Sequence, residues 1–259
     1  AYLRTLNSYI RWYAGTYGDN VPCVLMRVNA LEYIAYLRNI KHLQEKSVNT
    51  QIAALTHFDC FLTESGLAKE FALSHEDYFR VQQSIASLCL VSQADVEEFR
   101  QKVLLGQGVR DYAIVTVMAY AGLRISEVLK LGLYDIDFTA GEIGVHGGKG
   151  DKARIVWVND KIERAVKEYL KVRPETECPY LFVSRQGGML NRTRLNQICK
   201  KYSDVITPHQ LRHFFCSHAL EVGYTVAEVA NQAGHSNPYT TMQYTNPSRK
   251  QMQEKANRL

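Results

Sequence analysis

The sequence predicts a mainly α-helical protein that carries one small antiparallel β-sheet. Apolar residues recur at helical spacing through most of the 259 residues. Three short β-prone runs, separated by glycine-rich turns, interrupt this pattern near the middle of the chain. A capping-box pattern at Ser92 divides the chain into an N-terminal helical bundle over 1–90 and a second domain over 92–259. A chain of this length can bury a sizeable core in two such domains.

The first domain is expected to be a compact bundle of about four helices. Three of them are marked by apolar residues at helical spacing, namely Leu3, Leu6, Ile10 and Tyr13; Val28, Leu31, Ile34 and Leu37 within 24–40; and Ile52, Leu55, Phe58 and Phe61–Leu62 between about Ser47 and Gly66. A fourth, weaker helix is expected over 75–88, and 87–93 is the expected linker.

The second domain is expected to open with a helix over 93–105, because Ser92 is followed three residues later by Asp95. The next helix, 110–122, is apolar on most faces, should be buried, and ends at Gly122. The expected strands are 134–138, 142–146 and 154–158, with 147–151 as the last hairpin loop. The remaining expected helices are 126–131, 161–172, 193–202, 209–221, 225–233 and about 238–245, with a tail after Pro247.

The charge of the chain is unevenly distributed. The formal net charge is +5, and residues 1–91 carry 8 Lys or Arg against 8 Asp or Glu, so the remaining 23 against 18 place the whole excess in residues 92–259. Such an excess is compatible with a polyanionic partner, although an ordinary solvated basic surface explains it equally well.

The cysteines and the hydropathy favour a cytoplasmic protein. The six cysteines are scattered without a C-x-x-C spacing, which indicates reduced thiols rather than a disulfide framework. No apolar run approaches the ~18 residues of a membrane span, so no membrane partner is expected. No charged-then-apolar leader is present, and the opening Ala1 indicates processing or trimming.

Two of four local patterns that could carry chemistry lie near the middle of the chain. Arg124 follows the expected buried helix, and Glu127 comes three residues later, as in an ordinary surface ion pair. Lys149 lies among glycines in the expected hairpin loop, where a lysine is usually just solvated. Neither pattern alone predicts a site.

The third pattern is Thr207-Pro208-His209-Gln210-Leu211-Arg212-His213. Pro208 is well placed at a helix start, and His209 and Arg212 then share one face. The spacing of His209 and His213 also matches zinc peptidases, but those enzymes have a glutamate beside the first histidine where this chain has Gln210. We therefore expect no metal.

The fourth pattern runs from Gly234 to Thr245 and contains His235 and Tyr244. A lone tyrosine usually serves packing, and Tyr244 is one of 16. Considered together, however, the four patterns supply two arginines, a lysine, two histidines and a tyrosine, which suit attack on a phosphodiester. Arginines can bind both free phosphate oxygens, a cationic pocket or base can activate the tyrosine, and a lysine can protonate the leaving alkoxide. Such chemistry needs no cofactor.

Residues 92–259 resemble the tyrosine recombinase, or phage integrase, family. The chain has A-G-L-R-I-S-E, then G-K-G-x-K-x-R in the expected hairpin, then H-x-L-R-H, G-H-S and T-T-x-x-Y-T in the family's order. Each motif alone is weak, but five in this order are specific. The resemblance implies a catalytic domain over 92–259 and a core-binding, SAM-like helical domain over 1–90.

The resemblance also implies a role for each matching residue. Arg124 and Arg212 would bind the scissile phosphate, with a hydrogen bond from His235, and Tyr244 would form a 3′-phosphotyrosyl bond. Lys149 would be the general acid for the 5′-oxygen, and His209 would assist proton transfer at the nucleophile. The remaining matches are Glu127, which would support the site, and Lys152 and Arg154, which would contact the DNA backbone. Tyr239 falls outside the T-x-x-Y frame and is expected to pack.

The family implies an assembly as well. Its members act as tetramers on two double-stranded DNA sites with specific core sequences, through a Holliday junction, and integrate, excise or resolve mobile elements or replicons. We expect a homotetramer, or a heterotetramer with a related recombinase. The tail after Tyr244 would dock on a neighbouring protomer, or alternatively pack on its own domain. With no room for an arm-binding domain, the chain resembles the simpler Xer recombinases and transposon-encoded resolvases and integrases.

Three other interpretations remain open. A type IB topoisomerase shares the site chemistry but relaxes DNA as a monomer. A non-catalytic DNA-binding protein could keep the same fold, although all six candidate catalytic residues are present. An all-helical regulator would make the motif matches coincidental.

Overall fold

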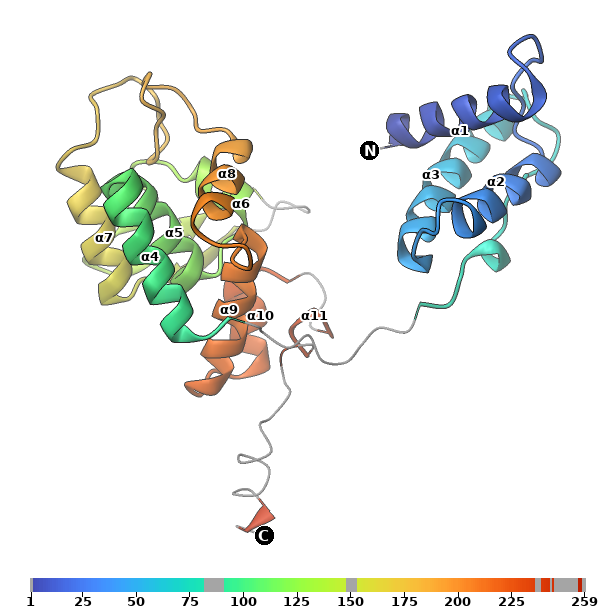
Figure 1. Ribbon diagram of the computed structural model, residues 1–259. Coiled ribbons are helices and arrows are strands. Elements are labelled where there is room, and N and C mark those ends of the chain that lie inside the picture. Colours follow the sequence, from blue (N-terminus) through green and yellow to red (C-terminus); the bar gives the residue numbers. More distant parts are fainter. Residues whose placement is uncertain are drawn as a thin grey trace. The chain divides into compact units, whose positions relative to one another are not determined.

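The computed structural model describes residues 2–81, 91–147, 153–235, 239–242, 244 and 256–257. The chain forms two compact units, Ala1–Gln83 and Ser84–Leu259. The described residues are mainly helical and include one three-stranded antiparallel sheet, which confirms the predicted fold class (Figure 1). No helix in these ranges is both long and apolar enough to cross a membrane.

Three α-helices build the described part of the first unit: α1 (Tyr2–Tyr17), α2 (Arg27–Asn39) and α3 (Glu45–Glu64). The prediction of a fourth helix over 75–88 is wrong for the described residues 75–81. Only the 3-10 turn His75–Asp77 forms, and 78–81 is not helical. The side chain of Asn49 on α3 accepts from the backbone N–H of Phe79 at 2.9 Å and donates to its carbonyl at 2.8 Å. These bonds hold Phe79 in a non-helical segment.

The faces that α1 and α2 bury agree only in part with the expected ones, and Tyr13 of α1 is buried as expected. Thr5, Tyr9 and Tyr13 are buried on α1, whereas Leu3 is 76% exposed and Ile10 is 48% exposed. The ring of Tyr9 meets the edge of Tyr33 of α2 with centroids 5.2 Å apart, and its hydroxyl donates to the carbonyl of Val24 at 2.7 Å. On this face of α1, the rings of Tyr9 and Tyr13 therefore take the place of the expected aliphatic side chains, and the Tyr9 hydroxyl has an acceptor. On α2, Ile34 and Leu37 are buried as expected, whereas Val28 and Leu31 are exposed.

Helix α5 (Val109–Ala121) is the centre of the second unit and packs against α4 (Gln93–Gln107), α7 (Asp160–Leu170) and α9 (Pro208–Glu221). It is buried from Ala113 to Ala121, as its apolar sequence predicted. Helix α4 begins at the predicted capping box, where the Ser92 hydroxyl accepts from the Asp95 N–H at 3.2 Å and the Asp95 carboxylate accepts from the Ser92 N–H at 2.8 Å.

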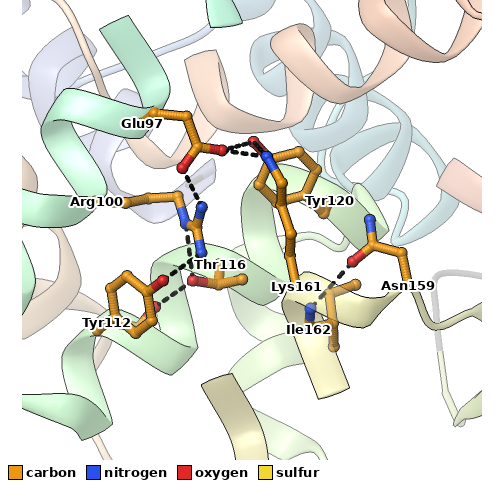
Figure 2. A network of polar contacts seen from close by, with 8 residues as sticks. All are labelled: Glu97, Arg100, Tyr112, Thr116, Tyr120, Asn159, Lys161 and Ile162. Atoms are coloured by element: carbon orange, nitrogen blue, oxygen red, sulfur yellow. Dashed lines mark hydrogen bonds and ion pairs between the residues drawn. The ribbon is translucent and has the colours of Figure 1, made fainter. Parts of the chain in front are cut away.

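A network of polar side-chain contacts joins α4, α5 and α7 (Figure 2). Arg100 of α4 is 2% exposed, donates to the hydroxyls of Thr116 at 3.0 Å and Tyr112 at 2.7 Å, and pairs with Glu97 at 2.5 Å. The same Glu97 pairs with Lys161 of α7 at 2.5 Å and accepts from the hydroxyl of Tyr120. Hydrogen-bond acceptors and aromatic rings thus contact the buried guanidinium. Because these contacts come from both helices, they fix how α4 packs against α5.

Arg100→Met should lower the free energy of unfolding by about 2–3 kcal/mol, because two hydroxyls, one carboxylate and two aromatic faces lose a buried cation at once. Urea denaturation followed by circular dichroism measures the change. Lys102→Met is the matched control, since its pair with Glu98 is solvent-exposed and should contribute less than about 0.5 kcal/mol. Equal urea midpoints for the two variants would contradict a structural role for the network.

The sheet lies between α6 (Ile125–Lys130) and α7 in the chain and consists of β1 (Ile136–Asp137), β2 (Glu142–Val145) and β3 (Arg154–Trp157), in that order. Ile143, Val145 and Val156 point into the core of the second unit. Val145 pairs with Arg154 at the end of the β2–β3 ladder. Residues 146–153 therefore connect an antiparallel pair, as the sequence predicted; 148–152 lie outside the described residues.

The remaining helices follow the predicted order: α8 (Arg192–Tyr202), α9, α10 (Val226–Ala233) and α11 (Tyr239–Met242). The hydroxyl of Thr207 caps α9 by accepting from the Gln210 N–H at 3.1 Å, and Pro208 occupies its first turn as predicted. The expected docking tail after Pro247 lies outside the described residues, apart from 256–257.

Candidate active site

The first part of the site is the sharp turn between α5 and α6. Gly122 ends α5 with φ 65°, in the left-handed region that favours glycine. A Cβ atom at this position would lie 2.2 Å from Cδ1 of Phe215 on α9, so the glycine also permits close approach. The carbonyl of Gly122 accepts a hydrogen bond from Nη1 of Arg212 at 2.7 Å. This turn therefore brings α9 and its arginine next to Arg124.

Arg124 immediately precedes α6 as its N-cap residue and forms the ion pair with Glu127 that the sequence indicated. Its Nη1 lies 2.9 Å from Oε1 of Glu127, and its backbone N–H donates to Oε2 at 2.7 Å. Nη2 of Arg124 donates to the carbonyl of Gly234 at 2.5 Å. The Arg124 side chain is nevertheless 41% exposed, whereas that of Glu127 is 4% exposed. The carboxylate thus supports the arginine from the protein side.

Arg154 occupies a position different from the expected one. The resemblance implies a contact with the DNA backbone, but the Arg154 side chain is only 9% exposed and pairs with Glu127 at 3.0 Å. Its guanidinium also donates to the carbonyl of Gln232 at 2.9 Å. A buried carboxylate requires a cation, and Arg154 supplies it, so the described geometry gives Arg154 a role inside the protein.

Helix α9 contributes Arg212 and two histidines. Arg212 is 7% exposed, and burial together with the nearby charge of Arg124 lowers its pKa to about 10. Nε2 of His209 lies 2.6 Å from Nε2 of His213 one turn later. Within the described residues, no third His, Cys, Asp or Glu joins this pair to form a metal-binding group.

The end of α10 and the segment after it contribute His235 and Tyr244. His235 follows Gly234, which ends α10 in the left-handed conformation with φ 68°. Nδ1 of His235 lies 2.7 Å from the hydroxyl of Thr241, which is fully buried, and the backbone N–H of Tyr244 donates to the carbonyl of Thr241 at 3.0 Å. Thr241 therefore links the expected nucleophile to the histidine.

The ring of Tyr244 lies close to two histidine rings. The His213 ring meets it edge-on with centroids 4.9 Å apart, and the His235 ring is nearly parallel to it at 6.3 Å. Sequence reasoning considered His213 only as a metal ligand and missed this contact. The H-x-x-x-H spacing was its signal, because the second histidine follows the first by one helical turn.

Burial keeps the histidines of the site neutral. Desolvation lowers the pKa of His209, and the charge of Arg212 adds to this effect. Burial followed by the charges of His209 and Arg212 lowers the pKa of His213 to about 4. Burial and the charges of Arg212, Arg124 and Arg154 lower that of His235 to about 4. A neutral imidazole can donate a hydrogen bond from one ring nitrogen and accept one at the other.

The structure thus brings five of the six expected catalytic residues into one region: Arg124, His209, Arg212, His235 and Tyr244. The sixth, Lys149, and the expected DNA contact Lys152 lie outside the described residues. The five residues come from α6, α9 and the segment that follows α10, across 121 positions of the chain.

Comparison with known proteins identifies the family of this chain. Residues 91–251 match the phage integrase family. The chain belongs to the phage integrase family. The "TnP I resolvase" of Bacillus thuringiensis is 45% identical over 98% of this chain and 90% of its own length. The tyrosine recombinase XerA of Pyrococcus horikoshii is 30% identical over 87% of this chain and 78% of its own.

A solved relative agrees in fold. The Tn1549 transposon integrase, in complex with transposon right-end DNA, superposes with a TM-score of 0.71 over 98% of this chain and 92% of that one, at 19% identity. As a phage integrase family member, the chain is a tyrosine-type site-specific recombinase.

Proposed function

We propose that this recombinase cleaves and rejoins DNA through a covalent 3′-phosphotyrosyl intermediate on Tyr244. The observation that carries the proposal is the proximity of the Tyr244 ring to His213 and His235, since His235 in turn lies near the charges of Arg124 and Arg212. A tyrosine beside neutral histidines and two arginines is equipped to attack an anion, because the cations offset phosphate charge and His209 can accept the tyrosine proton.

Arg124 and Arg212 would bind the two non-bridging oxygens of the scissile phosphate. A guanidinium carries five N–H donors in a planar fork that suits phosphate. The bond from Nη1 of Arg212 to Gly122 uses one of these donors and fixes the plane of the fork. His235 would donate a third hydrogen bond, with its ring oriented by Thr241. The repulsion that lowers the pKa of Arg212 would be relieved when an anion binds.

The reaction balances without an external energy source. The Tyr244 oxygen attacks phosphorus, its proton passes to His209 or to solvent, and the bond from phosphorus to the 5′-oxygen breaks. Lys149 would give the 5′-oxygen a proton, which leaves a 5′-hydroxyl and a phosphotyrosine. The phosphodiester is conserved as a phosphotyrosyl ester, so a 5′-hydroxyl of a partner strand can attack it and release Tyr244 without ATP.

The partner would be double-stranded DNA with specific core sites, which the first unit and Lys152 would bind. The assembly would be a homotetramer, or a heterotetramer with a related recombinase. It would exchange strands through a Holliday junction. The 45% identity to a resolvase favours resolution or movement of a mobile element as the biological role. The type IB topoisomerase and the non-catalytic DNA-binding protein are the alternatives, and they make different predictions on plasmids.

One plasmid experiment separates these functions. A supercoiled plasmid with two candidate core sites, taken from the DNA that flanks the coding element, should yield two recombinant circles, and the same plasmid without sites should stay supercoiled. Relaxation of the site-free plasmid without recombinants would identify a topoisomerase. Binding of core-site DNA with neither nicking nor covalent adduct would identify a non-catalytic protein.

A further inference from the structure

The Arg154 guanidinium joins three elements of the second unit. Arg154 begins β3, opposite Val145 of β2. Its Nη1 and Nη2 each donate to one oxygen of Glu127, both at 3.0 Å, and its Nε donates to the carbonyl of Gln232 at 2.9 Å. A further bond from Nη2 reaches the carbonyl of Ala233 at 3.3 Å. One side chain therefore fixes β3 to α6 and to the last turn of α10.

Glu127 is the shared partner of two arginines. Oε1 accepts from Nη1 of Arg124 at 2.9 Å and from Nη1 of Arg154 at 3.0 Å. Oε2 accepts from the Arg124 backbone N–H at 2.7 Å and from Nη2 of Arg154 at 3.0 Å. Burial alone would raise the pKa of this carboxyl, but the hydrogen bonds and charges of Arg154 and Arg124 outweigh burial and lower it. Ionised Glu127 thus depends on Arg154.

The C-terminal turn of α10 is the second link. Its carbonyl groups carry the negative end of the helix dipole, which favours cations. Arg154 binds the carbonyls of Gln232 and Ala233, and Arg124 binds that of Gly234. A Cβ on Gly234 would lie 2.6 Å from Cζ of Arg154, so only glycine lets the guanidinium fit here. His235 is the next residue, and its position follows from this packing.

We propose that Arg154 is a positioning residue, which holds the Glu127 carboxylate and the end of α10 so that Arg124 and His235 meet the same phosphate. This inference rests on the proposed function. It assigns Arg154 no contact with DNA, since the side chain is 9% exposed, compared with 41% for Arg124. It also requires arginine, because a lysine ammonium lacks the planar fork that spans both Glu127 oxygens and a carbonyl.

The first test separates binding from cleavage. In Arg154→Met, DNA affinity should stay within about threefold of wild type, while single-turnover cleavage at saturating protein should fall about 100-fold, since displaced catalytic groups cost this much. Arg154→Lys should keep the fold and lose part of the rate, and Arg164→Met, an exposed arginine of α7, should change neither quantity. Lost affinity with unchanged cleavage at saturation would overturn the proposal, because it would make Arg154 a DNA contact.

The pH profile tests the link through Glu127. Arg154 is the largest contribution that opposes burial, so without it the pKa of Glu127 should rise and the carboxylate should be protonated at a higher pH than in wild type. Cleavage by Arg154→Met should therefore fall more steeply than wild-type cleavage as pH is lowered, and Arg154→Met/Glu127→Gln should lack this additional fall. Besides Arg154, the charged groups that face Glu127 are Arg124 and, farther off, Arg212. The histidines of the site titrate in both the single and the double variant, so their effect on the rate is the same in both pH profiles. A rate loss independent of pH would overturn the proposal.

Urea unfolding tests the link between Arg154 and Glu127 without a measurement of DNA cleavage. In wild type the pKa of Glu127 is lowered on folding, so its ionised form adds to the free energy of unfolding above the unfolded-state pKa. In Arg154→Met the pKa should be higher, so ionisation of Glu127 should add less to the free energy of unfolding or reduce it as pH rises. The gap between their urea midpoints should therefore widen as pH rises, and it should stay constant in the Glu127→Gln background. A constant gap in both backgrounds would refute the link. A wild-type chain that forms no adduct while the gap widens would instead refute the proposed function.

Discussion

Tyr244→Phe should abolish the covalent adduct between the chain and DNA. The substitution removes only the phenolic oxygen, which is the atom that would bond to phosphorus. The ring keeps its place beside His213 and against the apolar cluster around Phe215, so the fold and DNA binding should persist. A suicide substrate, nicked near a core site so that the released strand diffuses away, traps the adduct. Its yield should fall at least about 1,000-fold, as when other nucleophiles are removed.

Tyr239→Phe is the matched control for this experiment. Tyr239 lies five residues before Tyr244 but outside the T-x-x-Y frame, so its variant should form the adduct at the wild-type level. Peptide mapping of the trapped complex should place the DNA on the peptide that contains Tyr244. An adduct that survives in Tyr244→Phe and disappears in Tyr239→Phe would assign the nucleophile to Tyr239 and refute the proposed site.

Local chemistry made much of the second unit predictable. The Ser92 capping box, the break at Gly122 and the start of α9 at Pro208 all depend on contacts within a few residues, and the structure confirms each of them. The expected site residues came from motif order rather than geometry. Their convergence depends on packing between α5, α9 and α10, for which no short-range signal exists.

The first unit shows where periodicity misleads. The sequence predicted that α1 buries Leu3, Leu6, Ile10 and Tyr13, whereas the structure buries Thr5, Tyr9 and Tyr13. Counting apolar residues favours the first set, but tyrosine rings bury more area once their hydroxyls find acceptors. That acceptor for Tyr9 is the carbonyl of Val24, 15 residues away, which helical periodicity alone does not identify.

Arg154 illustrates the same limit in the site. Its motif neighbours are lysines and glycines of a hairpin, which favour a solvent-facing cation. Its partners are Glu127 and the carbonyls of Gln232 and Ala233, which lie 27, 78 and 79 residues away. Only the three-dimensional structure shows that a buried carboxylate binds this arginine.

Lys149→Ala should reduce DNA cleavage by about 100- to 10,000-fold, the range that a general acid contributes. The 5′-oxygen leaves as an alkoxide, which is far too basic to leave unprotonated at neutral pH. Lys149 belongs to the connection between β2 and β3, outside the described residues, and Arg154 at the end of that connection pairs with Glu127 of the site.

A 5′-phosphorothiolate substrate decides whether the lost step is proton donation. A thiolate leaves without a proton because the pKa of a thiol lies near ~8.5, so this substrate should restore cleavage by Lys149→Ala to within about tenfold of wild type. Lys152→Ala is the matched control, since a lost contact with the DNA backbone should weaken binding of both substrates equally. If the sulfur substrate does not rescue Lys149→Ala, Lys149 is not the general acid, and the proton must reach the 5′-oxygen from another group of the site.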